Sequence, residues 1–273
     1  MTFLLSAIFF VFGLIIGSFL NVVILRLNTD RTFGGRSGCM SCQHVLSWFE
    51  LIPVFSFLGL GGRCRHCKAK ISIQYPIVEL ISGIVFLSLF LKFQNVFSSD
   101  FPIFAIVFSY YAVMFSLLLI VAVYDLRHKI IPDILSLIFG ALAFIGLFFL
   151  SPGLDSMVIY PHIPSGLDFL SGFIIALPFV FFWLISSGRW MGLGDGKLAL
   201  GIGWMLGLAM SLSSLVLAFW FGAIVGIIMI VVSKYKQIER VHMKSEIPFA
   251  PFLVLGAFLA LIFSLNFFGI GFW

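Results

Sequence analysis

Two aspartates stand where long apolar runs end, a setting in which carboxylates can do acid–base chemistry. Asp125 closes one run in the segment VAVYDLRHKIIPD, and Asp195 lies in the glycine-rich segment MGLGDGK just before another run. A pair of carboxylates that share one proton can split a peptide bond, because the ionised member takes a proton from water while the neutral member hydrogen-bonds the scissile carbonyl. The alternative interpretation is that both aspartates are helix caps at the membrane edge.

Glycines surround Asp195 on both sides. Because glycine has no Cβ, we expect these residues to let the backbone turn sharply and to let an extended substrate strand come close. Lys197 is expected either to bias the carboxylate pair electrostatically or to extend its amine to the membrane interface. The glycines of this predicted turn are Gly192, Gly194 and Gly196.

Two further acidic residues lie near the ends of apolar runs. Asp133 follows Pro132 and is predicted to cap the next helix. Glu79 lies about one turn inside an apolar run, where an unpaired charge is costly. We therefore expect Glu79 to have a partner, with Arg26 and Lys70 as the candidates.

All four cysteines lie in one loop, as two CxxC pairs. Cys39 and Cys42 form the first pair, and Cys64 and Cys67 form the second. Two thiolates separated by two residues can bind one tetrahedral zinc ion, and two such pairs complete a site with no open coordination position. The predicted zinc is therefore structural. The competing interpretations are disulfides, which a reducing cytoplasm disfavours, and a thioredoxin-like redox pair.

The composition indicates that these residues belong to a membrane protein. Of the 273 residues, 62% are hydrophobic and 10% are charged, and the mean hydropathy is +1.19. The formal net charge is +5, but the basic residues cluster in a few loops, which indicates membrane topology rather than nucleic-acid binding. We expect an all-α polytopic membrane protein that binds the lipid bilayer and no nucleic acid.

About eight spanning helices are predicted from apolar runs of roughly 20 residues. With this count all of the 16 Lys and Arg residues except Lys92 fall in loops on one side of the membrane. The excess of positive charge predicts that those loops, and the aspartate pair, face the cytoplasm and that both termini lie outside. The predicted runs are 3–24, 76–91, 102–123, 134–150, 169–185, 198–210, 214–232 and 249–268.

Three parts follow from this topology. Residues 1–25 form the first transmembrane helix, 26–75 form a cytoplasmic zinc-binding loop domain, and 76–273 form the transmembrane domain with both aspartates. The loop domain has too little apolar surface to fold alone. We therefore expect zinc to hold the loop domain together.

Several motifs occur in a characteristic order along the chain. They are GSFLNVVILRL (17–27), the two CxxC pairs, GGRCRHC running into ISIQYPIVEL (61–80), the Asp125 segment, GLGDGK (192–197) and EIPFAPFL (246–253). Together they resemble the bacterial type 4 prepilin peptidases, a family of GxGD aspartyl proteases. The resemblance implies that Asp125 and Asp195 are catalytic and that the four cysteines bind zinc. It also implies cleavage of the basic leader peptide from prepilins and pseudopilins at the cytoplasmic face of the bacterial inner membrane.

Many members of this family also methylate the new N-terminal amine, so the resemblance implies S-adenosylmethionine as a cofactor and loop 26–75 as the candidate methyltransferase region. The segment WFELIP (48–53) matches a family motif in which asparagine usually stands at the position of Leu51. Within this segment Glu50 is the candidate for cofactor binding. Asn28 and Ala250 replace a proline and a glycine that are typical of the family. The departures at Leu51 and Asn28 lie in the part that the resemblance associates with methyl transfer, and they favour proteolysis over methyl transfer.

Other classes of protein stay open at this point. A transporter would place its carboxylates near the membrane midplane among broken helices, whereas these aspartates are predicted at one face. A zinc-bearing membrane scaffold would explain the cysteines and leave the aspartates as caps. Presenilin-like and preflagellin peptidases share the GxGD turn, but the cysteine loop favours the prepilin branch. The sequence leaves open the oligomeric state, the prepilins cut and the pathway served.

Overall fold

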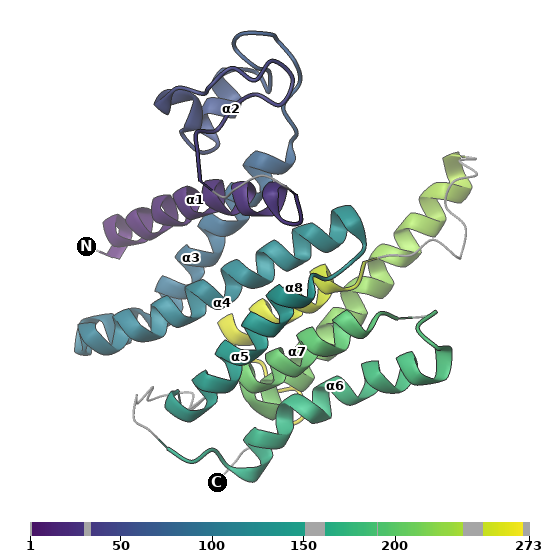
Figure 1. Cartoon of the computed structure of the whole chain (residues 1–273). Helices are drawn as coiled ribbons and strands as arrows, with labels where there is room; N and C mark the ends of the chain where they lie inside the picture. The colour runs from purple at the N-terminus through teal and green to yellow at the C-terminus, as the bar shows by residue number, and fades with distance from the viewer. Residues whose placement is uncertain (1, 30–33, 151–161, 190, 237–247, 270–273) are drawn as a thin grey trace. The chain divides into compact units, whose positions relative to one another are not determined.

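The chain folds into helices in a computed structural model that describes residues 2–29, 34–150, 162–189, 191–236 and 248–269 (Figure 1). The all-helical class is confirmed over these residues, which include isolated bridges such as Gly38–Val45 and Arg63–Lys70 but no strand. By its contacts the chain divides into two compact units, 1–116 and 117–273.

Five helices are long and apolar enough to cross a membrane, judged by length and composition, and two apolar helices are shorter. Each of the eight predicted runs overlaps a helix, but two of them, 198–210 and 214–232, share a single long helix, and the helix in the run 249–268 ends at Ile262. The long helices are α1 (Thr2–Arg26), α3 (Gln74–Ser99), α4 (Phe101–His128), α6 (Gly166–Ser186) and α7 (Leu193–Lys236), and the shorter ones are α5 (Asp133–Phe149) and α8 (Ala250–Ile262).

The predicted break between those two runs, at 211–213, lies instead at Gly207. This residue has φ 72° and ψ 171°, so α7 consists of two helical segments joined at a kink. Glycine adopts such a conformation because it has no Cβ to clash with the backbone. Ser211 and Ser213 stay helical, and their hydroxyl groups donate to the carbonyls of Gly207 and Ala209 one turn earlier.

In the first unit α1 packs closely along α3. A Cβ on Gly13 would lie 2.7 Å from the Ser82 carbonyl oxygen, and one on Gly17 would lie 2.7 Å from the Glu79 Cα. Small residues at such a crossing let two spanning helices approach each other at the backbone. The helices α1 and α3 are therefore a tightly packed pair.

The loop that joins α1 to α3 forms a small lobe beside the start of α3 (Figure 1). It contains a 3₁₀ helix, η1 (Trp48–Leu51), and one short α-helix, α2 (Phe55–Gly59). The two cysteine pairs lie in the rest of the loop, outside these two helices. The lobe is the segment predicted as the zinc-binding loop domain.

In the second unit α7 packs along α5, α6 and α8. A Cβ on Gly203 of α7 would lie 2.6 Å from the Gly172 Cα of α6, and the Ser171 hydroxyl donates to the Gly203 carbonyl at 2.9 Å. Because α7 is held against three other helices, the position of its first turn, which carries Asp195, is set by the surrounding bundle. Glu246 and Ile247 of the predicted C-terminal motif lie outside the described residues.

Candidate active site

Asp125 lies in the last turn of α4, on the buried side of the helix. The predicted run ended at residue 123, but α4 continues to His128, so the helix itself holds the carboxylate. The side chain is only 5% exposed. Its Oδ2 accepts a hydrogen bond of 3.3 Å from the backbone N–H of Ala250, the first residue of α8. The end of one helix and the start of another therefore meet at this carboxylate.

Asp195 lies in the first turn of α7 and is 9% exposed. The charge of Asp125 acts on it, so the structure brings the two carboxylates of the second unit within electrostatic reach. Its Oδ1 is buried and makes no hydrogen bond to any described residue. A buried polar atom without a partner is uncommon, and it is a frequent feature of functional sites.

The structure corrects the sharp turn expected of the three glycines, whereas the approach of a substrate strand stays a prediction. None of Gly192, Gly194 and Gly196 has the left-handed φ of a glycine-dependent turn, because α7 begins at Leu193 and the last two lie in its first helical turn. The close approach at Gly194 is made by the chain itself, since a Cβ there would lie 2.9 Å from the Cβ of Ile131. Gly194 therefore makes room for the loop between α4 and α5.

Lys197 forms an ion pair with Asp133, the first residue of α5. Both side chains are accessible, with exposed fractions of 44% and 80%. The lysine amine is therefore engaged by a carboxylate outside the buried pair. Asp133 is the first residue of α5, but the cap predicted for it is wrong, because Pro132 holds the N-cap position and no side-chain hydrogen bond caps the helix. Asp133 instead joins the start of α5 to the first turn of α7.

Ala250 and Ile131 are the residues at this site that sequence reasoning missed as contacts. Ala250 was noted only as a departure from a family glycine, yet it is fully buried and its N–H group donates to Asp125. A backbone donor needs no particular side chain, so no side-chain pattern could identify it. Ile131 contacts Gly194 from a loop, and only the fold brings these two together.

The four cysteine sulfurs of the loop form a cluster in which all atoms lie within 4.8 Å of one another. The Sγ atoms of Cys39 and Cys67 are 3.8 Å apart, and a tetrahedral zinc with Zn–S bonds of about 2.3 Å requires S···S separations of about 3.8 Å. A disulfide requires an S–S bond of about 2.05 Å, and all four cysteines are free. The donor set fits zinc, with no coordination position left for a substrate.

The two cysteine pairs lie on turns of the same design. Gln43 donates its N–H to the Cys39 carbonyl and Lys68 donates its N–H to the Cys64 carbonyl, at 2.9 and 3.0 Å. Both donors have left-handed φ angles, of 56° and 59°. The N–H groups of Cys42 and Ser41 also point at the Cys39 sulfur and lower the pKa of this thiol to about 6, which favours the metal-binding thiolate.

Glu50, the candidate cofactor ligand, is engaged within its own turn. Its Oε2 accepts the Ser47 N–H at 2.8 Å, as part of a capping box at the start of η1. This backbone hydrogen bond lowers the pKa of the Glu50 carboxyl. Beside it the Arg65 guanidinium lies 5.2 Å from the centre of the Phe49 ring. The second cysteine turn, which contains Arg65, therefore contacts the turn that contains Glu50.

Glu79 is 7% exposed in α3, and its partner differs from the basic residues expected. Its Oε2 accepts a hydrogen bond of 2.7 Å from the backbone N–H of Val54. Val54 has φ 62° and ψ −50°, a strained conformation for a β-branched residue. The buried carboxylate therefore ties the loop to the second turn of α3.

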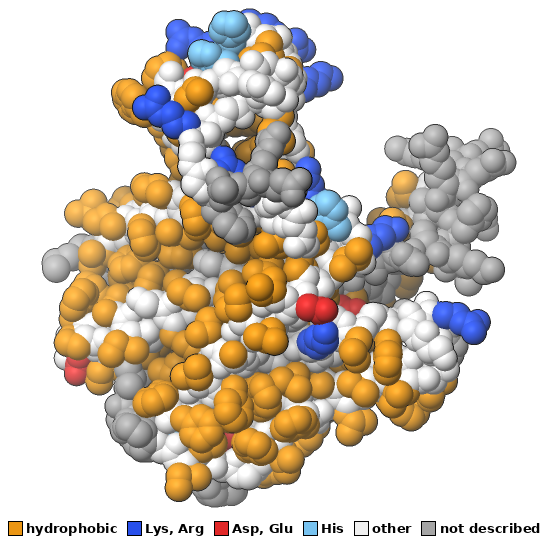
Figure 2. Space-filling model, in the orientation of Figure 1, with side chains coloured by type: hydrophobic (Ala, Val, Ile, Leu, Met, Phe, Trp, Pro, Cys, Tyr) orange, Lys and Arg blue, Asp and Glu red, His pale blue; other side chains and the backbone are white. Residues whose placement is uncertain are grey.

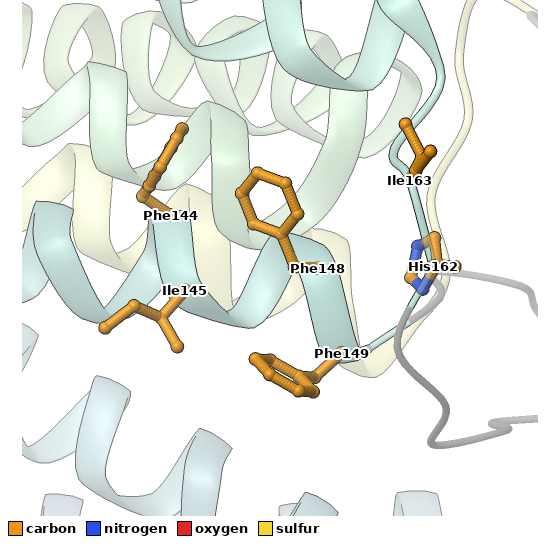
Figure 3. Close-up of a pocket in the computed structure, with 6 residues that line it drawn as sticks. All are labelled: Phe144, Ile145, Phe148, Phe149, His162 and Ile163. Carbon is orange, nitrogen blue, oxygen red and sulfur yellow. The ribbon is translucent and has the colours of Figure 1, made fainter.

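A cavity of about 480 Å³ lies elsewhere in the second unit, at the end of α5 that is opposite to Asp133 (Figure 3). One histidine is the only polar side chain among those that line it. It contains no carboxylate, so it is not the site defined by the aspartates. Its lining residues are Phe144, Ile145, Phe148, Phe149, His162 and Ile163.

Fold and site together define a helical, multi-pass membrane protein with two buried carboxylates contributed by different helices and a separate four-cysteine cluster. The family model described as Bacterial Peptidase A24 N-terminal domain matches residues 11–93. The model described as Type IV leader peptidase family matches residues 112–227.

Curated relatives carry the name prepilin leader peptidase/N-methyltransferase. The protein of Bacillus subtilis is 31% identical over 94% of this chain and 94% of its own length. That of Pseudomonas aeruginosa is 30% identical over 92% of this chain and 88% of its own length. The protein of Myxococcus xanthus is 34% identical over 83% of this chain, but the match spans only 64% of its length. No solved structure matches. The chain belongs to the A24 family of type IV prepilin leader peptidases.

Proposed function

We propose that this protein is an aspartyl endopeptidase of the bacterial inner membrane that removes the basic leader peptide from prepilins and pseudopilins at the cytoplasmic face. The observation that supports this most strongly is the pair of buried carboxylates, Asp125 and Asp195, within electrostatic reach of each other. Membership of the family supports the substrate class.

In this mechanism the two aspartates share one proton and act as a unit. The ionised carboxylate takes a proton from an attacking water while the protonated one donates a hydrogen bond to the scissile carbonyl. The Ala250 N–H holds Asp125 in place through Oδ2. The unpartnered Oδ1 of Asp195 is available to the water or the substrate. Either aspartate can serve as the base.

We propose a structural role for zinc bound by Cys39, Cys42, Cys64 and Cys67. Four thiolates fill the coordination sphere, so the metal would take no part in peptide hydrolysis. It would hold together the two turns of a loop whose regular structure is otherwise limited to η1 and α2.

Methyl transfer from S-adenosylmethionine to the new N-terminal amine is the second proposed reaction, and it is supported by the names of the relatives. The cofactor would supply an electrophilic methyl group. Glu50, the candidate ligand, already accepts a hydrogen bond from Ser47, so it does not stand out as a free acceptor for this cofactor. The support for peptidase activity is therefore broader than the support for methyl transfer.

The first prediction concerns the aspartate pair. In a membrane-reconstituted assay with a prepilin and radiolabelled S-adenosylmethionine, Asp125→Asn and Asp195→Asn should each abolish leader removal, because an amide cannot share the catalytic proton. Losing an acid–base group typically costs about 10²–10⁴-fold in rate. Lys197→Met is the matched control, because it removes a charge from the same helical turn as Asp195 but leaves both carboxylates.

Each outcome of this assay has a distinct meaning. Cleavage retained in both asparagine variants would remove the pair from the mechanism. Cleavage with label on the mature N-terminus of the unmodified protein would establish both reactions, whereas cleavage without label would leave a peptidase alone.

A further inference from the structure

The loop between α1 and α3 exposes large apolar side chains on both of its short helices. Trp48 and Leu51 of η1 are 79% and 40% exposed, and Phe55 and Leu58 of α2 are each 68% exposed. Residues three apart share one face of a short helix. Each helix therefore presents an apolar pair, and these four residues are called the loop patch below.

The helix α2 has a packed face as well as an exposed one. Phe57, on another face of α2, covers Gly62, where a Cβ would lie 2.9 Å from the Phe57 Cζ. Phe57 and Leu60 are both partly buried. The short helix α2 therefore has an inner face packed on its own loop and an outer face that carries Phe55 and Leu58.

The hydrogen bond from the Val54 N–H to Glu79 fixes the start of α2 at a defined level along α3. Glu79 is the sixth residue of α3, so at 1.5 Å per residue it lies about 7 Å along the helix from its start. The Val54 N–H that it binds opens α2. Because α3 is apolar enough to span a membrane, α2 begins at the level of the apolar part of α3. At this level α3 itself presents the exposed apolar side chains of Ile77 and Ile81.

The backbone of this segment is also suited to a lipid environment. Unpaired N–H groups are costly near hydrocarbon. Here the N–H groups of Ser56, Leu58 and Leu60 donate to loop carbonyls at 3.0–3.1 Å, those of Gly61 and Gly62 do so at 3.1 and 2.9 Å, and that of Val54 donates to Glu79. The segment can therefore enter the headgroup region without leaving these donors unsatisfied.

Charge complementarity identifies the kind of lipid. Residues 26–75 contain seven Lys and Arg side chains and only two acidic ones, Asp30 and Glu50. Figure 2 shows basic and hydrophobic side chains side by side on the lobe that carries α2. Basic segments beside a spanning helix attract anionic headgroups, and tryptophan favours the membrane–water interface.

We propose that the loop patch is a membrane anchor, in which Trp48, Phe55 and Leu58 lie in the headgroup and upper acyl region of the leaflet beside the start of α3. The occupant of this surface is lipid, with a preference for anionic headgroups. The anchor would keep the loop at the membrane surface. It is independent of the proposed peptidase and methyltransferase activities.

The test uses the full-length protein labelled with 5-fluorotryptophan and reconstituted in nanodiscs that contain anionic lipid. The ¹⁹F signal of Trp48 is assigned by its loss in Trp48→Phe. Trp220 of α7, which is 64% exposed on an apolar helix, serves as the lipid-facing control. A spin label on the upper acyl chain should broaden both signals. A water-soluble paramagnetic agent should leave the Trp48 signal sharp.

Two contrary results would overturn the proposal. Broadening of the Trp48 signal by the aqueous agent would place the loop patch in water. Protection from both agents would mean that another part of the chain or a second copy covers it. In the variant Phe55→Ser with Leu58→Ser, Trp48 should become accessible to the aqueous agent, and a retained zinc content would show that the loop is still folded. Replacing anionic with neutral lipid should also increase aqueous access.

Discussion

At the scale of single residues, the environment of Asp195 combines two features that are costly to fold. Its carboxylate is buried beside that of Asp125, and one of its oxygens lacks a hydrogen bond among the described residues. Leaving a buried acceptor without a partner typically costs about 1–3 kcal/mol. Such an arrangement suits a site that binds water or substrate, because the unused acceptor is then satisfied.

A second residue-scale prediction concerns Gly194. The change Gly194→Ala should destabilise the protein by about 1–3 kcal/mol, because the added methyl group would overlap the Ile131 side chain. The matched control is Gly196→Ala in the same turn, where the nearest atom is 3.4 Å away and contact is ordinary. Thermal unfolding in detergent measures both. Equal midpoints for the two variants would contradict the assigned contact.

At the scale of elements, the kink in α7 separates its first segment, which starts at Leu193 and carries Asp195, from the longer segment that follows. The first segment packs on α6 through Gly203, while Gly256 of α8 packs against Ser214 of the second. Since the two segments have different neighbours, the bend lets one helix follow two packing directions.

The prediction at this scale is that Gly207→Ala lowers stability by about 1–3 kcal/mol, because a residue with a Cβ is strained at φ 72° and ψ 171°. Gly222→Ala in the same helix should be neutral or slightly stabilising, since its nearest neighbour would be 3.6 Å away and alanine favours helix by about 1 kcal/mol. The order of the two unfolding midpoints is the measurement. If Gly207→Ala and Gly222→Ala have equal unfolding midpoints, glycine is not required at the kink.

At the scale of the whole molecule, the cysteine cluster lies in the first unit and the aspartate pair lies in the second. Most of the helical residues of the chain lie outside the cysteine loop. Loss of the metal should therefore disorder the loop and spare the long helices.

The corresponding prediction is one zinc per chain by elemental analysis, with zinc lost in the double variant Cys39→Ser and Cys64→Ser. Trypsin should then cut the loop severalfold faster, while far-ultraviolet circular dichroism stays nearly unchanged. Because the thiols must be deprotonated to bind, lowering the pH should release zinc and raising it should not. Ser41→Ala, between two ligands, should keep the metal. A loop that resists trypsin equally without zinc would refute the structural role.

Local patterns predicted much of this structure. The apolar runs overlap helices because about 20 apolar residues can satisfy their backbone in a membrane only as helix or barrel. The cysteine spacing predicted a four-sulfur cluster because each CxxC pair forms its own turn. Both inferences depend on residues that are close together in the chain. The membrane orientation, with both termini outside, stays a prediction.

The errors concern contacts between distant residues. The glycines around Asp195 were expected to form a sharp turn, but helix α7 begins there and Ile131 occupies the space beside Gly194. Glu79 was expected to bind a basic residue, but the nearby backbone of the loop offers the Val54 N–H. In both cases the partner is a common group, whose identity carries no signal in the sequence.

The sequence by itself determined the membrane class, the helical segments, the four-cysteine cluster and the two aspartates worth considering, because composition and short-range spacing decide each of these. Only the tertiary structure decided that Asp125 and Asp195 approach each other, that Ala250 donates to Asp125, and that Lys197 pairs with Asp133. The physical reason is that packing of α7 against α5, α6 and α8 brings together helix ends that lie far apart in the chain. Such packing depends on the shapes of whole helix faces, which no short motif records.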